Sequence, residues 1–175
     1  MSYKPKKHIA LVGMMGSGKT TLGGILAKQL GVDFIDSDRQ LELQANATIA
    51  EIFERDGEEK FRLAEQNFIC DILQNNKTPF VLATGGGAFL NAQTRQICKK
   101  YATTIWLRAD FDTIYERVKL NPKRPLLQKP NKEQIIKQLI KEREPFYKKA
   151  DIVVDSLGSN PYLRVENIIN ELKDV

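Results

Sequence analysis

The sequence predicts an α/β fold of three layers, in which helices cover both faces of a parallel sheet. Five short apolar runs alternate with helical patterns along the 175 residues. Continuously apolar runs are typical of strands buried on both faces, and helices between them favour parallel pairing. Because this length suits one well-buried domain and is short for two, we expect a single domain over residues 1–175.

The predicted elements follow one another in a regular order. The first strand, "HIALVG", precedes a helix over 20–30 that ends at Gly31. Helices also follow the third and fourth strands and precede the fifth, and a last helix begins at Asn160 and Pro161. The strands are predicted at 8–13, 32–36, 79–84, 102–108 and 151–155.

Between the second and third strands the sequence predicts three helices. The first is "RQLELQ". Thr48 and Glu51 form a capping box, which opens a second, short helix through Arg55. After Gly57 a longer helix runs to about Gln74. Its buried stripe is predicted at Phe61, Ala64, Phe68 and Ile72.

The distribution of charge is compatible with a small anionic ligand. The chain has 27 basic and 22 acidic residues, and from Arg117 to Lys149 there are eleven basic residues and three acidic ones. Aromatic residues are not interleaved with these charges, and no helix-turn-helix or RNA-binding signature is present, so we expect no nucleic-acid partner. Residues 120–131 contain three prolines and are predicted to form a surface loop.

Several classes of protein are excluded by what the sequence lacks. No run approaches eighteen apolar residues, so we expect no membrane partner. Cys70 and Cys98 form no C-x-x-C pair and are expected to be reduced thiols. His8 is the only histidine, which rules out a histidine triad. We expect a cytoplasmic protein with Trp106 in its core.

The stretch "GMMGSGKT" fits G-x-x-x-x-G-K-[S/T], the phosphate-binding loop. An apolar strand precedes it and a helix follows, which is the context that this motif requires. Its glycines let successive N–H groups converge on an anion at the positive end of the helix. Lys19 is expected to reach the β- and γ-phosphates, and the Thr20 hydroxyl to bind Mg²⁺.

The motif predicts a nucleotide but no particular reaction. A GTPase would need N-K-x-D, and in the nearest candidate, "NKTP", Pro79 replaces the aspartate. "DSLG" at 155–158 fits D-x-x-G, but it lies near the carboxyl end, in the wrong order for a switch. We therefore set the GTPase interpretation aside.

Two aspartates end the second predicted strand. Residues two apart on a strand share a face, so Asp36 and Asp38 are expected to point together into the crevice at the strand ends. One carboxylate would then belong to the Mg²⁺ site, and the other would bind a substrate hydroxyl. The alternative is that Asp38 or Ser37 caps the next helix.

The third strand ends in "TGGGA", where Gly85 to Gly87 allow close approach of a ligand and supply N–H donors. A flexible turn is the alternative.

Three arginines outside the loop are candidates for anion binding. Arg143 falls on the apolar stripe of its helix, and a buried guanidinium needs an anion such as a carboxylate. Arg62 flanks the stripe of its own helix and can equally pair with Glu58 at i−4. Arg124 lies in the basic, proline-rich loop, either as a solvated surface charge or as a lid residue that meets the transferring phosphoryl group.

In order and spacing, "GMMGSGKT", "DSD", "DGEEKFR", "TGGGA", "RPLL" and "REPFY" resemble the motifs of the shikimate kinase family over nearly the whole chain. The resemblance implies a fold like that of nucleoside monophosphate kinases, with sheet order 2-3-1-4-5. It implies a monomer with a substrate-binding helical region about 37–62 and a lid loop about 117–131. The implied reaction is ATP-dependent phosphorylation of the 3-hydroxyl of shikimate, in aromatic amino-acid biosynthesis.

The resemblance also implies roles for individual residues. Lys19, Asp38 and Arg124 are the expected catalytic residues, with Asp38 as the base. Thr20 and Asp36 are expected to serve Mg²⁺, Asp36 through water. ATP is expected to contact Gly13, Gly16, Ser17, Gly18, Lys19, Thr20, Thr21, Arg117 and Arg124. Shikimate is expected to contact Asp36, Asp38, Arg62, Gly85, Gly86, Gly87 and Arg143.

Two alternatives remain from the residues alone. Another small-molecule kinase on this scaffold could act on gluconate or on a nucleoside monophosphate, although a site with two arginines and two aspartates disfavours a nucleotide acceptor. A non-catalytic ATP-binding module that regulates a partner is the other alternative. It leaves the aspartate pair and the lid arginine without a use.

Overall fold

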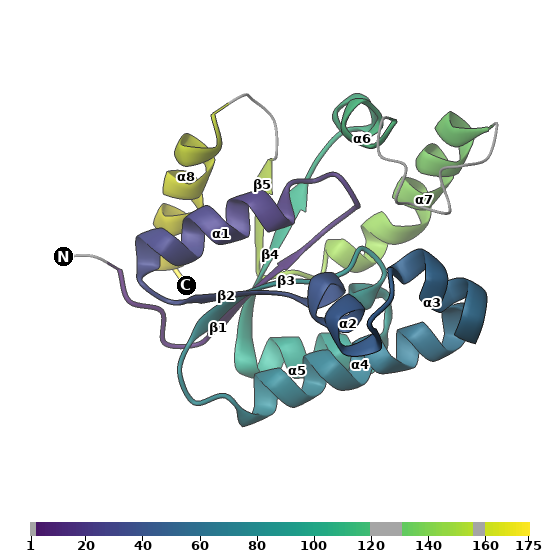
Figure 1. Ribbon diagram of the computed structural model, residues 1–175. Coiled ribbons are helices and arrows are strands. Elements are labelled where there is room, and N and C mark those ends of the chain that lie inside the picture. Colours follow the sequence, from purple (N-terminus) through teal and green to yellow (C-terminus); the bar gives the residue numbers. More distant parts are fainter. Residues whose placement is uncertain (1–2, 120–130, 156–159) are drawn as a thin grey trace.

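Five parallel strands form one sheet in the order β2-β3-β1-β4-β5, which confirms the expected order (Figure 1). The computed structural model describes residues 3–119, 131–155 and 160–175. The strands are β1 (His8–Val12), β2 (Asp33–Asp36), β3 (Phe80–Ala83), β4 (Ala102–Arg108) and β5 (Ile152–Asp155). Each lies within about one residue of its predicted bounds.

Helices cover both faces of this sheet, as Figure 1 shows. On one face lie α1 and α8, and on the other lie α4 and α5. The helices of the described residues are α1 (Lys19–Leu30), α2 (Ser37–Ala45), α3 (Ile49–Asp56), α4 (Glu58–Asn75), α5 (Ala92–Tyr101), α6 (Phe111–Val118), α7 (Lys132–Tyr147) and α8 (Pro161–Lys173), with a 3-10 turn η1 (Ala88–Leu90).

Alternation along the central strand β1 divides the core into two clusters. Ile9 and Leu11 pack with residues of α1 and α8, whereas Ala10 and Val12 pack with residues of α4, α5, α6 and α7. All four side chains are at most 1% exposed. Both faces of the sheet are therefore buried, which explains why the strands are continuously apolar.

Local signals placed several helix ends correctly. Gly31 ends α1 in the left-handed conformation, with φ 66°, as helix-ending glycines commonly do. The capping box at the start of α3 is present: Thr48 N–H donates to Glu51 Oε2 at 2.7 Å, and Glu51 N–H donates to Thr48 Oγ1 at 3.3 Å. Asn160 caps α8, which begins at Pro161.

The residues that follow β2 differ from their prediction. Strand β2 stops at Asp36, and this residue caps α2 by accepting a hydrogen bond from Arg39 N–H at 3.2 Å. Asp38 therefore lies in the first turn of a helix instead of on a strand face, and neither it nor Ser37 is the cap. The strand itself was predicted to end at residue 36. The shared-face argument failed because it continued strand geometry to Asp38, through residues whose carboxylate and hydroxyl groups favour a helix start.

The buried stripe of α4 also differs from its prediction. Its buried residues are Phe61, Glu65, Ile69 and Leu73, spaced four apart, while Ala64 is exposed. The prediction used apolar residues alone and therefore excluded Glu65 from the core. It placed the buried stripe on the neighbouring row of residues along the helix. Glu65 is nevertheless 1% exposed.

The expectations for Trp106, the two cysteines and His8 hold in the described residues. Trp106 is buried, and both cysteines are free thiols. His8 begins β1 and packs against Phe80, with 4.1 Å between ring centroids. No helix in the described ranges has the length and apolar character needed to span a bilayer. Residues 120–130, the greater part of the predicted lid loop, lie outside the described residues.

Candidate active site

The carboxyl ends of β1, β2 and β3 meet at one edge of the sheet, because these neighbouring strands are parallel. The glycine-rich loop follows β1, the aspartates follow β2, and the triple glycine follows β3. Such an edge is where parallel α/β sheets bind ligands. The three motifs, which are separate in the sequence, therefore lie together at one edge of the sheet.

The loop after β1 has the backbone that its glycines predict. Gly13, Gly16 and Gly18 have φ values of 138°, 76° and 97°, a region that side-chain-bearing residues rarely adopt. A Cβ atom at Gly13 would also lie 2.8 Å from the carbonyl oxygen of Leu107. Ser17 N–H donates to Met14 O at 3.2 Å, and α1 begins directly after Gly18. The loop therefore ends at the positive end of a helix.

Lys19 and Thr20 make contacts that connect this loop to its surroundings. The buried Lys19 Nζ lies across the loop and donates to the carbonyl oxygens of Gly13 and Met14, at 2.7 and 2.8 Å. Thr20 Oγ1 donates to Asp36 Oδ2 at 2.7 Å. A hydroxyl and a carboxylate are thus joined at the start of α1, and both are oxygen ligands of the kind that Mg²⁺ prefers.

A cavity of about 250 Å³ lies between the loop and the two aspartates. Arg117 reaches it from α6 and donates from Nη1 to the carbonyl oxygen of Gly16 at 2.9 Å. The cavity is lined by Met15, Gly16, Gly18, Lys19, Thr20, Thr21, Asp36, Asp38, Thr84, Gly86 and Arg117. It contains the expected nucleotide loop together with both aspartates.

The triple glycine lies where several charged side chains approach the backbone. A Cβ atom at Gly85 would meet Glu65 Oε1 and would lie 2.6 Å from Asp38 Oδ1. One at Gly87 would lie 2.6 Å from Arg62 Cζ. These glycines have no left-handed φ, unlike those of the first loop. Glycine is therefore required at these positions because charged side chains lie against the backbone, and not because the loop is a flexible turn.

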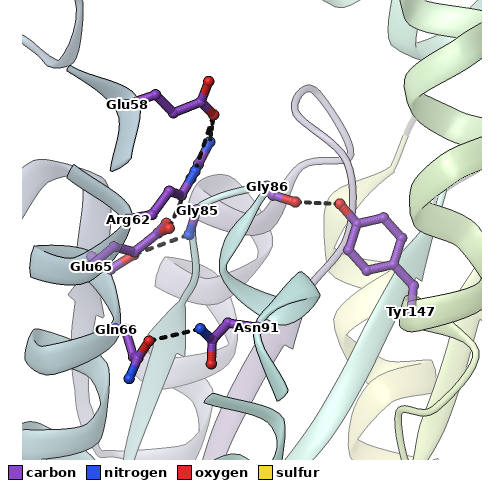
Figure 2. Close-up of polar contacts among 9 residues, drawn as sticks. Glu58, Arg62, Glu65, Gln66, Gly85, Gly86, Asn91 and Tyr147 are labelled. Carbon is purple, nitrogen blue, oxygen red and sulfur yellow. Dashed lines mark hydrogen bonds and ion pairs between the residues drawn. The ribbon is translucent and has the colours of Figure 1, made fainter. Parts of the chain in front are cut away.

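Arg62 forms ion pairs with two carboxylates, and the three side chains make up an ion-pair chain (Figure 2). Arg62 Nη2 lies 3.1 Å from Glu58 Oε1, and Arg62 Nη1 lies 2.8 Å from Glu65 Oε2. Pairing with Glu58 was the plainer expectation for Arg62, and the structure adds a second, buried partner. Burial raises the pKa of Glu65, and the negative charge of Asp38 adds to this effect, while Arg62 and Arg143 oppose it.

Arg143 is buried on α7, as its position on the apolar stripe predicted, with 6% exposure. A Cβ atom at Gly86 would lie 3.3 Å from Arg143 Nη1. The guanidinium groups of Arg62 and Arg143 thus both lie against the triple glycine, although 81 positions separate them in the sequence. Two cations at one bare backbone can bind a carboxylate between them.

The structure brings together all the predicted site residues except Arg124, which lies outside the described residues. It also adds three side chains that the sequence did not single out. Ser37 Oγ accepts a hydrogen bond from Gly85 N–H at 3.0 Å, Glu65 pairs with Arg62, and the Tyr147 hydroxyl donates to the Gly86 carbonyl oxygen. For Glu65 a signal was available, since it lies four residues after the buried Phe61 and three after Arg62.

Comparison with known proteins agrees with this geometry. The family model "Shikimate kinase" matches residues 15–173. The shikimate kinase of Bartonella quintana is 39% identical over 99% of this chain and 82% of its own length. That of Nitrobacter winogradskyi is 49% identical over 86% of this chain and 69% of its own length.

A solved structure extends the likeness to three dimensions. The shikimate kinase of Acinetobacter baumannii in complex with shikimate aligns with a TM-score of 0.92 and 36% identity, covering 96% of this chain and 93% of the other. A phosphate-binding loop, an aspartate pair and two arginines at a triple glycine, Arg143 buried and Arg62 half-buried, accompany this match over nearly the whole length. The chain therefore belongs to the shikimate kinase family.

Proposed function

We propose that this chain transfers the γ-phosphoryl group of ATP to the 3-hydroxyl of shikimate as a cytoplasmic monomer that uses Mg²⁺. One observation carries the assignment of roles. Arg62 and Arg143 meet at the triple glycine, within reach of Asp38 and next to the phosphate-binding loop. A carboxylate-binding end and a hydroxyl-binding end thus lie side by side.

The nucleotide would bind at the first loop and at Arg117. Backbone N–H groups from Gly13 to Thr20 would hold the phosphates, and Lys19 would turn from its two carbonyl partners toward the β- and γ-phosphates. The Thr20–Asp36 pair fits Mg²⁺, which commonly binds one or two carboxylates in addition to substrate phosphates. Bound there, Mg²⁺ would neutralise phosphate charge, with Thr20 as a direct ligand and Asp36 acting through water.

The acceptor would be held by its carboxylate and its hydroxyls. Arg62 and Arg143 would clamp the carboxylate, and N–H groups of the triple glycine would add donors. Asp38 would accept hydrogen bonds from the ring hydroxyls. Because Gly85 lacks a side chain, the Asp38 carboxylate can lie directly against the backbone of this loop.

In the transfer step the 3-hydroxyl oxygen attacks the γ-phosphorus in line, and the bond from that phosphorus to the bridging oxygen of ADP breaks. Asp38 orients the hydroxyl and accepts its proton late. Lys19 stabilises charge that develops on the phosphoryl oxygens. Arg124, which lies outside the described residues, is the proposed lid residue that reaches the same oxygens on closure.

ADP release measured in parallel with shikimate, gluconate, CMP and AMP tests the proposal. Of these four acceptors, we expect only shikimate to raise ADP release above the background measured with ATP and no acceptor. Release with gluconate and not with shikimate would favour the gluconate kinase alternative. ATP binding without release for any acceptor would favour the regulatory module. Release that persists after Mg²⁺ is removed with a chelator would contradict the assignment of the metal.

A further inference from the structure

The three carbonyl groups of the triple glycine are all hydrogen-bonded, but only the middle one by a distant side chain. Ala88 N–H donates to Gly85 O at 3.2 Å, and Leu90 N–H donates to Gly87 O at 3.1 Å. Both of these bonds belong to the local turn that leads into η1. The Gly86 carbonyl instead accepts from the hydroxyl of Tyr147, which comes from α7, 61 positions away.

The same loop leaves two N–H groups available. Gly85 N–H is taken by Ser37 Oγ. Among the hydrogen bonds of residues 3–119, 131–155 and 160–175, none uses the N–H of Gly86 or of Gly87 as donor. Unpaired backbone donors at a ligand site are the groups that a bound anion can satisfy.

The Gly86 carbonyl and the Gly87 N–H belong to one planar peptide group. In the trans form, which all peptide bonds of the described residues adopt, they point in opposite directions. A bond that holds the carbonyl toward α7 therefore directs the Gly87 N–H away from α7. Figure 2 shows Tyr147 and Arg62 on opposite sides of this loop, and a Cβ atom at Gly87 would lie 2.6 Å from Arg62 Cζ, so Arg62 lies beside this peptide.

We infer that Tyr147 is a positioning residue for the acceptor: it fixes the orientation of the Gly86–Gly87 peptide, whose Gly87 N–H is one of the donors already proposed for the substrate carboxylate beside Arg62 and Arg143. The inference rests on the proposed function. Glycine has more backbone freedom than any other residue, so a run of three needs an external restraint to hold one orientation. Tyr147 supplies it from the same helix that carries Arg143, one turn earlier.

The surroundings of Tyr147 suit a permanent donor. Its side chain is 1% exposed, and its ring lies 6.0 Å from that of Trp106. Burial raises the pKa of Tyr147 to about 12, although the positive charge of Arg143, a hydrogen bond between Arg143 and the Tyr147 hydroxyl, and the positive charge of Arg62 oppose this. The hydroxyl therefore keeps its proton at neutral pH and donates. It also lies 3.8 Å from Met14 Sδ in the phosphate-binding loop, so an effect on ATP must be measured separately.

Tyr147→Phe tests the inference, because it deletes one hydroxyl and keeps the buried ring. Steady-state kinetics should give a shikimate KM raised about tenfold, equivalent to about 1.4 kcal/mol of lost binding, with the ATP KM within about twofold of the unaltered chain. The control is Tyr101→Phe, which removes a hydroxyl from a partly buried ring at the end of α5. This control should leave both KM values unchanged.

A second readout is the ¹⁵N–¹H resonance of the Gly87 amide. In the unaltered chain it should shift when shikimate is added, and in Tyr147→Phe the shift should be markedly smaller. An unchanged shikimate KM, an equal rise in both KM values, or an undiminished Gly87 shift would overturn the inference. Absence of shikimate-dependent ADP release by the unaltered chain would instead refute the proposed function itself.

Discussion

The two halves of the site are built in opposite ways. The nucleotide half, Gly13 to Thr20, is one continuous stretch whose backbone N–H groups, with the side chains of Lys19 and Thr20, are proposed to bind the phosphates and Mg²⁺. The acceptor half is made of side chains that come from α2, α4 and α7 and meet at the loop after β3. Its members are Asp38, Arg62, Glu65, Gly85, Gly86, Gly87 and Arg143.

Glycine has a different purpose in each half. In the nucleotide half it permits left-handed φ values, so that successive N–H groups can converge. In the acceptor half the backbone has ordinary φ values, and glycine makes room for carboxylate and guanidinium groups. A glycine motif therefore indicates a ligand site in both cases. Only in the nucleotide half do the glycines also indicate the backbone conformation of the loop.

We expect the largest loss of turnover from a change in the nucleotide half. Lys19→Met keeps the length of the side chain and removes its charge. Turnover should fall about 10³-fold, the upper range for losing one donor to a developing charge. Lys28→Met, on the exposed face of the same helix, is the matched control and should be near normal. A loss of less than tenfold in Lys19→Met would mean that the loop backbone alone carries phosphate stabilisation.

Asp38→Asn is the corresponding change in the acceptor half. Turnover should fall by at least about 100-fold, as expected for losing a general base. The comparison variant is Asp33→Asn, which alters an exposed aspartate at the opposite end of β2. Near-normal turnover with Asp38→Asn would remove the role of base and leave Asp38 as a binding residue only.

Arg143→Ala separates the two halves by substrate. The shikimate KM should rise about 30-fold, within the range for losing one charged hydrogen-bonded contact, while the ATP KM changes less than about twofold. Arg39→Ala, an exposed arginine of α2, serves as control. Equal increases in both KM values would show that the halves are coupled and would argue against a carboxylate clamp.

The smallest effect concerns stability and pH. Burial raises the pKa of Glu65 above its ordinary value of 4.5, so the protonated form is favoured in the folded state. Its stabilising contribution is complete below that ordinary value and is lost as the pH rises through the folded pKa. Because glutamine carries no such proton, the stability of the unaltered chain relative to Glu65→Gln should decline as the pH rises from 4.5.

Denaturant unfolding at a series of pH values measures this difference. Glu58→Gln, which removes the more exposed carboxylate partner of Arg62, is the matched variant at the other end of this ion-pair chain. A relative stability that grows with pH in the Glu65→Gln series would mean that Arg62 outweighs burial. Glu65 would then be an ordinary ion-pair partner.

Much of the molecule could be predicted from local patterns. Apolar runs gave the strands, the capping box and Gly31 gave helix ends, and the phosphate-binding loop was recognisable because its function depends on eight adjacent residues. Arg143 was identified because a guanidinium on an apolar stripe contradicts the pattern around it.

The errors arose where a polar residue interrupts a pattern. Asp38 was expected to share a strand face with Asp36, although Asp36 caps a helix there. The stripe of α4 was placed one row away because Glu65 occupies a core position. In both cases the residue that broke the pattern belongs to the site.

By itself the sequence determined the three-layer α/β class and the nucleotide loop, and it singled out the arginines and aspartates that we propose to bind anions or cations. Only the tertiary structure decided that Glu65, Ser37 and Tyr147 join them, and which glycine each one contacts. The reason is physical: backbone conformation in a short loop depends on adjacent residues, whereas convergence of α2, α4 and α7 on one loop depends on how the helices pack against the sheet.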